Sequence, residues 1–549
     1  MSESVPKKDG GQIAAMQLRK AGIDALFGVV AGPSIQIFAG AHEVGMRVIG
    51  GRLELNAGFM AQAWGYQKKK PGVMVVGSGP GMSNAVTPLY VATASGLPLV
   101  VLGGSAFSQT RGVGGFQEAD QVALARPASK WVGQVDRTER IPEWIHLALG
   151  KALEGRPGGV YLDFPGEVVA KRIPAETIAL RDNTPVSAPY PDPNLIDEAA
   201  TLLASAKRPV IVLGKGAAWS DAGPAIQKLV DRGIPYVCSP MARGTIPDDH
   251  PNFANGARSM ALGEADLIVM FGGRFNWIFG HGRRFAAHSK IIQFDLEAEE
   301  MISGAPVSLG IVSDARKGAE LLDQALDSTT VTSSSGSWLG DLREKSEANV
   351  EKVRAALLDD SAPINPYRLV HEVSTVAPRE AIITAEGETI MGICRAVLPS
   401  YVNRSRLNAG TTGCMGVGAP YAIGSAIANP DAPSIAVLGD YAFGAAAMSV
   451  ETAARCGVKA TLVVANNEGI AGHGIQDAMM PSDAPRIASL LPARYEKIAE
   501  MVDGHSEYVE QPNQIRPALE RALSSDKIAV VHVRIDPKAG RLSGSNYLA

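Results

Sequence analysis

The sequence predicts an α/β protein with three doubly wound parallel-sheet domains. Its 549 residues are too many for one hydrophobic core, and this length suggests about three domains. Short apolar runs alternate with helix-like stretches along the chain, as in parallel sheets that are covered by helices on both faces. The high glycine content, 59 residues, suits the tight strand-to-helix turns of such sheets.

The apolar runs fall into three blocks, and each block is predicted to form one domain. We expect a first domain at residues 1–185, a central domain at 192–327 and a third domain at 362–549. A proline-rich stretch, 184–194, and a polar Ser/Thr stretch, 329–338, are predicted to be exposed connections. The predicted strands are residues 24–30, 72–79, 98–104, 158–164, 209–216, 234–240, 265–273, 290–297, 381–388, 434–440, 460–467 and 529–536.

Composition excludes several classes of protein. The formal net charge is −4, and no cluster of Lys and Arg is interleaved with aromatic residues, so we expect no nucleic-acid partner. No signal peptide and no apolar run long enough to span a bilayer is present, which favours a cytoplasmic location without membrane contact. The cysteines lack CxxC spacing and are predicted to be free thiols: Cys238, Cys394, Cys414 and Cys456.

Two turns in the third block carry the most informative residues. Asp440 follows an apolar strand and precedes a helix-like stretch, and Asn466 and Asn467 follow the next strand. An acid and an amide at the carboxyl ends of neighbouring parallel strands make an oxygen-rich site that suits a hard divalent cation. The same residues are compatible with a structural turn and an asparagine that caps a helix.

The spacing of these turns and the three-domain pattern resemble the thiamine diphosphate-dependent decarboxylases and synthases. The resemblance implies that Mg²⁺ joins the cofactor diphosphate to the side chains of Asp440 and Asn467 and to the carbonyl of Gly469. It also implies that the backbone at Tyr441 and Ala442 contacts the diphosphate. Tyr441 departs from the family pattern, which commonly has Gly or Ser there, so its side chain must point elsewhere.

Two further segments match this family. Glu54 is predicted to open a helix after a strand, where the family places the carboxylate that protonates the pyrimidine ring of the cofactor. Leu53 stands where the family usually has His, and a helix-start carboxylate favoured by the helix dipole is the alternative interpretation of Glu54. Met415, in a loop with Gly413, occupies the position of the apolar residue that holds the cofactor in its bent conformation.

Other motifs narrow the resemblance to the 2-hydroxyacyl-CoA lyases. The GGFQE segment at 114–118 is similar to acetolactate synthases and to these lyases, and GGRFNWIFGHG at 272–282 is similar to oxalyl-CoA decarboxylases and these lyases. The resemblance implies a reversible cleavage of a 2-hydroxyacyl-CoA to formyl-CoA and an aldehyde or ketone. Small residues at 31–34 leave room for a ketone such as acetone, from a 2-hydroxyisobutyryl group. Oxalyl-CoA decarboxylase, an acetolactate synthase-like enzyme and a catalytically silent nucleotide-binding relative are the alternatives.

The resemblance also suggests substrate-facing residues. Glu496 is the candidate base for the substrate hydroxyl, although an ion pair with Arg494 or Lys497 is the alternative. Gln117 is expected to orient the hydroxyl or carbonyl, and His473 is a weaker acid–base candidate. The candidates for contact with coenzyme A are Arg283, Arg284, Arg404, Arg406 and Tyr495.

Three expectations concern regions outside this site. The resemblance implies an ADP pocket in the central domain, which residues 214–216 and Asp295 would suit, and makes the tail at 540–549 a candidate lid over coenzyme A. Relatives place their cofactor between two chains, so Glu54 of one chain is expected to meet Asp440 of another. A homo-oligomer, a tetramer made of two catalytic dimers, is therefore expected.

Overall fold

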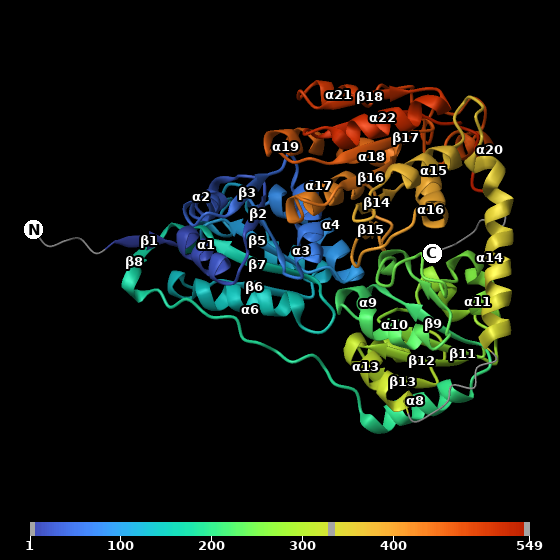
Figure 1. Cartoon of the computed structure of the whole chain (residues 1–549). Helices are drawn as coiled ribbons and strands as arrows, with labels where there is room; N and C mark the ends of the chain where they lie inside the picture. The colour runs from blue at the N-terminus through green and yellow to red at the C-terminus, as the bar shows by residue number, and fades with distance from the viewer. Residues whose placement is uncertain (1–5, 328–334, 543–549) are drawn as a thin grey trace, which may run out of the picture. The chain divides into compact units, whose positions relative to one another are not determined.

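Three parallel β-sheets organise the chain, as the sequence predicts (Figure 1). The computed structural model describes residues 6–327 and 335–542. By its internal contacts the chain divides into two compact units. The first takes in the chain up to Val186 together with Pro420–Pro430 and Ala446–Val458, and the second takes in the remainder.

The first unit holds a six-stranded parallel sheet with the strand order β3-β2-β4-β5-β7-β6. Its strands are β2 (Ala25–Gly28), β3 (Arg47–Gly50), β4 (Gly72–Val76), β5 (Leu99–Ser105), β6 (Trp131–Gln134) and β7 (Gly159–Pro165). The helices that accompany it are α1 (Gly10–Lys20), α2 (Ile35–Glu43), α3 (Glu54–Lys68), α4 (Pro80–Ser95), α5 (Gln121–Ala125), α6 (Ile141–Leu153) and α7 (Gly166–Ala170). A short antiparallel pair joins β1 (Lys7–Asp9) to β8 (Arg172–Pro174).

Helix α3 is buried along nearly its whole length because small residues let its neighbours approach closely. A Cβ atom added at Gly58 would lie 2.6 Å from Pro88 of α4, so only glycine fits there. Most of α17 (Gly418–Ala428) and all of α19 (Ser449–Arg455) also belong to this unit. Tyr421 of α17 packs edge-on against Phe59 and donates its hydroxyl to Gln62 over 2.7 Å, so α3 is held from both sides.

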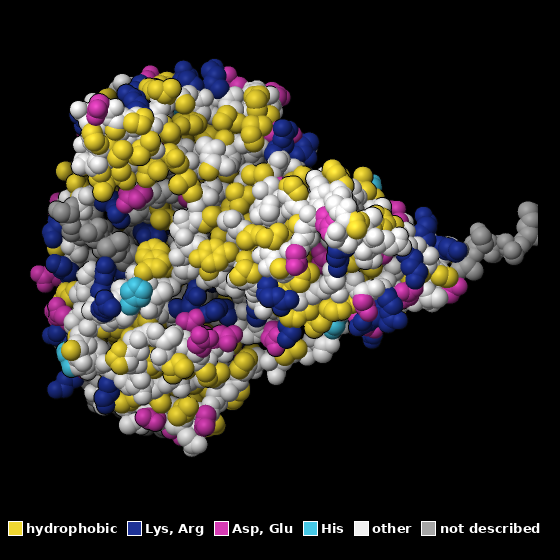
Figure 2. Space-filling model, turned by 180° about the vertical axis from the view of Figure 1, so that it is seen from behind, with side chains coloured by type: hydrophobic (Ala, Val, Ile, Leu, Met, Phe, Trp, Pro, Cys, Tyr) yellow, Lys and Arg dark blue, Asp and Glu magenta, His cyan; other side chains and the backbone are white. Residues whose placement is uncertain are grey.

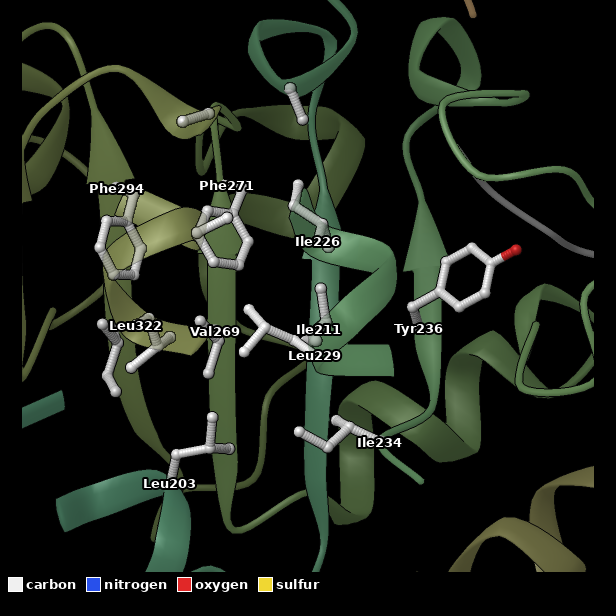
Figure 3. Close-up of a cluster of buried hydrophobic side chains, with 14 of the residues drawn as sticks. Leu203, Ile211, Ile226, Leu229, Ile234, Tyr236, Val269, Phe271, Phe294 and Leu322 are labelled. Carbon is white, nitrogen blue, oxygen red and sulfur yellow. The ribbon is translucent and has the colours of Figure 1, made fainter. Parts of the chain in front are cut away.

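The second unit begins with a five-stranded parallel sheet in the order β10-β9-β11-β12-β13. Phe271 and Phe294 stack at 4.7 Å between ring centres and, with Ile211, Val269 and Leu322, fill one face of this sheet (Figure 3). The strands are β9 (Pro209–Leu213), β10 (Tyr236–Cys238), β11 (Leu267–Phe271), β12 (Lys290–Asp295) and β13 (Leu309–Val312). The helices are α8 (Pro193–Ser205), α9 (Lys215–Trp219), α10 (Gly223–Asp231), α11 (Arg258–Glu264), α12 (Glu299–Ile302) and α13 (Ala315–Leu326).

The third sheet, also in the second unit, has six parallel strands in the order β15-β14-β16-β17-β19-β18. When the six strands of each sheet are numbered by their order in the chain, both sheets show the same spatial order of strands. The two sheets therefore share one topology. The strands are β14 (Ile382–Glu386), β15 (Arg406–Asn408), β16 (Ser434–Gly439), β17 (Thr461–Asn466), β18 (His505–Val509) and β19 (Ala529–Arg534). The helices are α15 (Pro366–Val376), α16 (Glu388–Val397), α18 (Asp440–Ala446), α20 (Gly474–Met479), α21 (Lys497–Glu500) and α22 (Pro512–Ser524).

One predicted connection differs in the structure. Of the polar stretch at 329–338, residues 329–334 lie outside the described part of the chain, and Ser335 begins the long helix α14 (Ser335–Leu357). Trp338 is buried and donates its indole N–H to the carbonyl of Pro209 over 3.3 Å, so this end of the stretch is not an exposed connection. Of the predicted lid at 540–549, residues 543–549 lie outside the described residues.

Surface and thiol chemistry agree with the composition. Among the described residues, no helix is both long and apolar enough to cross a bilayer. On the face shown in Figure 2, acidic and basic side chains are interspersed among apolar ones. The four cysteines are free thiols, as predicted.

Candidate functional site

A cavity of about 280 Å³ opens at the carboxyl ends of β14, β16 and β17 in the second unit. Every cofactor residue that the sequence predicts in this unit lines it: Gly413, Met415, Asp440, Tyr441, Ala442, Asn467 and Gly469. The remaining lining residues include Glu386, Gly387, Glu388, Thr389, Ile390, Met391 and Cys414. The predicted residues, although distant in sequence, therefore share one enclosed space.

Strand order explains why the cavity forms there. From β14 the chain moves outward to β15 on one side and then returns to β16 on the other side. The connections that leave β14 and β16 therefore diverge, and this switch point opens a crevice outside the carboxyl ends of the strands. Glu386 ends β14, Asp440 follows β16 and Asn466 ends β17, so their turns meet at this crevice.

Asp440 is a buried carboxylate held by backbone amides. Its Oδ1 accepts the N–H of Tyr441 over 2.8 Å, and its Oδ2 accepts the N–H of Gly469 over 3.0 Å. The hydrogen bond to Gly469 ties the two predicted turns together. Burial raises the pKa of Asp440 to about 6, because an ionised carboxylate is poorly solvated there. A bound cation would favour the ionised form.

The oxygen atoms of these turns fit a small divalent cation. The amide of Asn467 lies 2.9 Å from the carbonyl oxygen of Gly469 and 3.2 Å from Oδ1 of Asp440. Turned one way, its nitrogen donates to both and its oxygen accepts the N–H of Gly472 over 2.9 Å; turned the other way, its oxygen faces the other two, an arrangement that a cation would stabilise. Ligands of octahedral Mg²⁺ at 2.0–2.1 Å lie roughly 2.9 Å apart, which matches this spacing. The three residues can therefore hold Mg²⁺ once the amide of Asn467 turns its oxygen towards the other two and away from the N–H of Gly472.

Glu386 was not predicted as a site residue, yet it shapes the cavity. Its carboxylate accepts the backbone N–H groups of Gly416 and Gly418 over 2.5 and 2.6 Å, and so holds the loop that carries Met415. Burial raises the pKa of Glu386 to about 7 despite these hydrogen bonds. The signal that could have found it is an acid at the end of a predicted strand, followed by Gly387 and a helix.

Glu54 and Gln117 meet around the first turn of α4 in the first unit. Glu54 is the first residue of α3, as predicted, and its Oε2 accepts from Nδ2 of Asn84 over 2.9 Å. Gln117 accepts the hydroxyl hydrogen of Ser78 over 3.2 Å and adopts a positive φ of 52°. The structure thus brings the predicted carboxylate and amide to one helix end.

Glu496 lies away from the cavity and is fully engaged. Only 1% of its surface is exposed, and it is not among the residues that line the cavity. One oxygen accepts from Nε of Arg494 over 2.6 Å, and the other lies 2.7 Å from Nδ1 of His532. This placement disfavours the predicted role of Glu496 as a base, because both oxygens already have partners. The ring of neighbouring Tyr495 packs between Phe443 and His532.

The arginines predicted to bind coenzyme A have different environments. Arg406 is buried and donates to the backbone carbonyls of Cys394 and Leu398, which opposes the predicted contact with a phosphate. Arg404 forms an ion pair with Asp221. Arg283 and Arg284 are exposed at the end of the 272–282 segment.

Two arginines that the sequence did not single out, Arg258 and Arg395, interact electrostatically with other arginines. Arg258 and Arg395 each have a pKa lowered to about 10, first by burial and then by neighbouring arginines. Arg284 and Arg395 both lower the pKa of Arg258, and Arg541 lowers that of Arg395. Single-sequence inspection could not find this cluster because its members come from four distant segments.

The predicted ADP residues have structural explanations. A Cβ atom at Gly214 would lie 2.1 Å from the carbonyl oxygen of Gly272, so this glycine allows two backbones to touch. Asp295 accepts the N–H of Glu297 over 3.1 Å at the end of β12.

His473, the weaker acid–base candidate, lies 3.3 Å from a carboxylate oxygen of Glu468 and is not among the cavity residues.

Comparison with known proteins identifies the family. Residues 8–124 match the model of the N-terminal TPP-binding domain of thiamine pyrophosphate enzymes, 196–324 match their central domain and 387–533 match their C-terminal TPP-binding domain. TPP, thiamine pyrophosphate, is the same compound as thiamine diphosphate.

Relatives are similar along the whole chain. A 2-hydroxyacyl-CoA lyase of Oryza sativa subsp. japonica is 36% identical over 98% of this chain and 97% of its own length. An oxalyl-CoA decarboxylase of Escherichia coli (strain K12) is 34% identical, covering 99% and 98%. An acetolactate synthase large subunit of Mycobacterium tuberculosis is 31% identical, covering 98% and 97%. With three matching domain models and relatives similar from end to end, the chain belongs to the thiamine pyrophosphate enzymes.

Proposed function

We propose that this protein is a thiamine diphosphate- and Mg²⁺-dependent lyase that cleaves a 2-hydroxyacyl-CoA to formyl-CoA and an aldehyde or ketone, and catalyses the reverse condensation. Family membership and the cavity support the cofactor. The GGFQE and GGRFNWIFGHG segments and the 36% identical lyase of Oryza sativa subsp. japonica support this branch of the family.

The cavity residues have separate tasks in this proposal. Asp440, Asn467 and the carbonyl of Gly469 hold Mg²⁺, and Met415 supports the cofactor from the facing loop. Thiamine diphosphate, when bound, would supply a nucleophilic carbon and an electron sink for the bond that breaks. Glu54 holds a proton at the pyrimidine ring of the cofactor, in a site completed by a second chain.

The observation that carries a coenzyme A substrate is the arginine cluster next to α16. The first residues of α16 line the cavity, and Arg395 lies in its last turn. Within the second unit, Arg284 and Arg395 disfavour the charge of Arg258, and Arg541, which also pairs with Glu388, disfavours that of Arg395; a bound polyanion would favour these charges. Coenzyme A carries three phosphate groups, whereas the small 2-oxo acids of acetolactate synthases would not need such a cluster.

Oxalyl-CoA decarboxylase is the second candidate, because the same cluster would serve its substrate and a decarboxylase is 34% identical. One assay separates the candidates. The purified full-length chain, with thiamine diphosphate and Mg²⁺, is incubated with formyl-CoA and a panel of ketones and aldehydes, with oxalyl-CoA, or with pyruvate. We expect a 2-hydroxyacyl-CoA, identified by mass, with at least one carbonyl compound. Turnover of oxalyl-CoA or pyruvate alone would contradict the proposal.

Arg395 provides a structural test of the coenzyme A site. Arg395→Ala should raise KM for the acyl-CoA about tenfold or more, because a charge-assisted bond to phosphate is lost, and should change kcat little. The control is Arg354→Ala, since Arg354 is an exposed arginine paired with Glu351 on α14. Equal KM values for the two variants would argue against phosphate binding at the cluster.

A further inference from the structure

A chain of side-chain hydrogen bonds leads through the third sheet to the turn that carries Asn467. Arg494 donates its Nε hydrogen to Oε1 of Glu496 over 2.6 Å, and Oε2 of Glu496 lies 2.7 Å from Nδ1 of His532. Nε2 of His532 lies 2.9 Å from Nδ2 of Asn466, the last residue of β17. Glu496, His532 and Asn466 are all at least 97% buried, so water does not compete for these bonds.

The hydrogen bonds leave one consistent protonation state. Oδ1 of Asn466 accepts the N–H of Glu468 over 3.0 Å, so its Nδ2 must donate to His532. Nε2 of His532 is then an acceptor, and the ring is neutral with its hydrogen on Nδ1. That hydrogen is donated to Glu496, whose ionised carboxylate is balanced by Arg494. Burial lowers the pKa of His532, which favours the same neutral ring.

At its Asn466 end, this series of hydrogen bonds holds a strained piece of backbone. Glu468 adopts a φ of 61°, a left-handed conformation that is unfavourable for a residue with a side chain. Its N–H is held by Asn466, and its carboxylate lies 3.3 Å from Nε2 of His473 and 3.5 Å from Nη2 of Arg534. Asn467 lies between Asn466 and Glu468. The orientation of this metal-binding residue therefore depends on how firmly its two neighbours are held.

We propose that His532 and Glu496 are positioning residues for the metal-binding turn. By fixing the amide of Asn466, they hold the backbone at 466–469 so that Asn467 and Gly469 present their oxygens towards one point. This inference rests on the use of Mg²⁺ in the proposed function, but not on any particular substrate. It replaces the predicted role of Glu496 as a base with a role at a distance from the reacting atoms.

The test measures metal affinity and backbone protection in the full-length chain. His532→Ala should raise the apparent Kd for Mg²⁺, titrated by tryptophan fluorescence at saturating thiamine diphosphate, by about 10- to 100-fold, as for other groups that orient metal ligands. Glu496→Gln, which keeps its shape but loses its charge, should give a smaller increase. In both variants without metal, the amide of Glu468 should exchange its hydrogen faster than in the unmodified chain. At saturating Mg²⁺, kcat should remain within a few-fold.

Glu372→Gln is the matched control. Glu372 is equally buried in the second unit and pairs with Arg368 and Arg516, so its loss should lower stability without changing the Kd for Mg²⁺. An unchanged Kd and unchanged exchange in folded His532→Ala or Glu496→Gln would overturn the inference. A large fall in kcat at saturating Mg²⁺ with an unchanged Kd would also overturn it, because that result would indicate a catalytic role for Glu496. If the unmodified chain binds Mg²⁺ and thiamine diphosphate but cleaves no acyl-CoA, only the proposed function fails.

Discussion

At the scale of single residues, the candidate site consists of polar groups whose partners decide their tasks. The amide of Asn467 faces Asp440 across a buried turn, and a cation would be stabilising there when the amide presents its oxygen. Glu496 is also a buried carboxylate with a partner on each oxygen, but its partners are the side chains of Arg494 and His532, and it does not line the cavity. Residue type alone does not distinguish a metal ligand from a positioning group; the hydrogen-bond partners do.

Glu54 is the residue whose role is tested most directly. Glu54→Gln should reduce kcat by about 100-fold or more, because proton transfer to the cofactor ring is lost. Binding of Mg²⁺ and thiamine diphosphate, followed by calorimetry, should remain within a few-fold, since the metal ligands are untouched. Glu154→Gln is a control at an exposed glutamate paired with Lys151. Normal turnover by Glu54→Gln would refute the assignment.

At the scale of elements, three strand ends and one loop build the cavity. β14 contributes Glu386, whose carboxylate is hydrogen-bonded to the loop that carries Met415. β16 and β17 contribute the two turns proposed to bind the metal. These contacts are made by backbone amides, so the loop geometry depends on the charge of one buried carboxylate.

The pH dependence of stability should reveal Glu386. Its pKa is about 7 in the folded chain, above the ordinary 4.5, so the folded chain binds this proton more tightly than the unfolded chain does. Through this group the free energy of unfolding should fall by roughly 3 kcal/mol as pH rises from about 4.5 to about 7.

Glu386→Gln should remove this contribution. The free energy of unfolding of the variant, minus that of the unmodified chain, should therefore increase as pH rises from about 4.5 to about 7. Urea unfolding of the cofactor-free chain at several pH values measures the difference. Glu388→Gln, in which a half-exposed neighbour that pairs with Arg541 is changed, should show the pH profile of the unmodified chain. Parallel profiles for Glu386→Gln and the unmodified chain would contradict the assignment of the raised pKa.

At the scale of the whole molecule, two sheets share one strand order and the residues of the expected site belong to separate units. Glu54 lies in the first unit, and Asp440 and Asn467 lie in the second. The family resemblance implies that each active site takes Glu54 from one chain and the metal ligands from another.

Mixing two inactive variants tests this expectation. Glu54→Gln and Asp440→Ala should each be inactive alone, and their mixed dimers should contain one intact site and one doubly altered site. Equal, random mixing should restore about a quarter of the unmodified activity, since half of the dimers are mixed and each has one working site. Two samples of the same variant mixed together are the control. No recovery, with mixed dimers demonstrated by mass, would place both residues of a site on one chain.

Much of the fold and of the metal site follows from local sequence patterns. Continuous apolar runs must be buried on both faces, so they predicted parallel strands, and the turns after them indicated Asp440 and Asn467, while the family resemblance added Gly469. Parallel strands end at the same edge of a sheet, which is why residues far apart in sequence were expected to meet. Glu54 was singled out by the family resemblance, and the structure places it at the start of a helix, as predicted.

Only the tertiary structure decided which charged side chains are free to act. The sequence suggested Glu496 as a base and Arg406 as a contact for coenzyme A, yet both are buried with all-protein partners. Glu386 and the Arg258–Arg395 cluster gain their properties from segments distant in the chain. The physical reason is that burial and electrostatic neighbours arise from packing, whereas the sequence by itself determines the order of strands, helices and the chemistry at their ends.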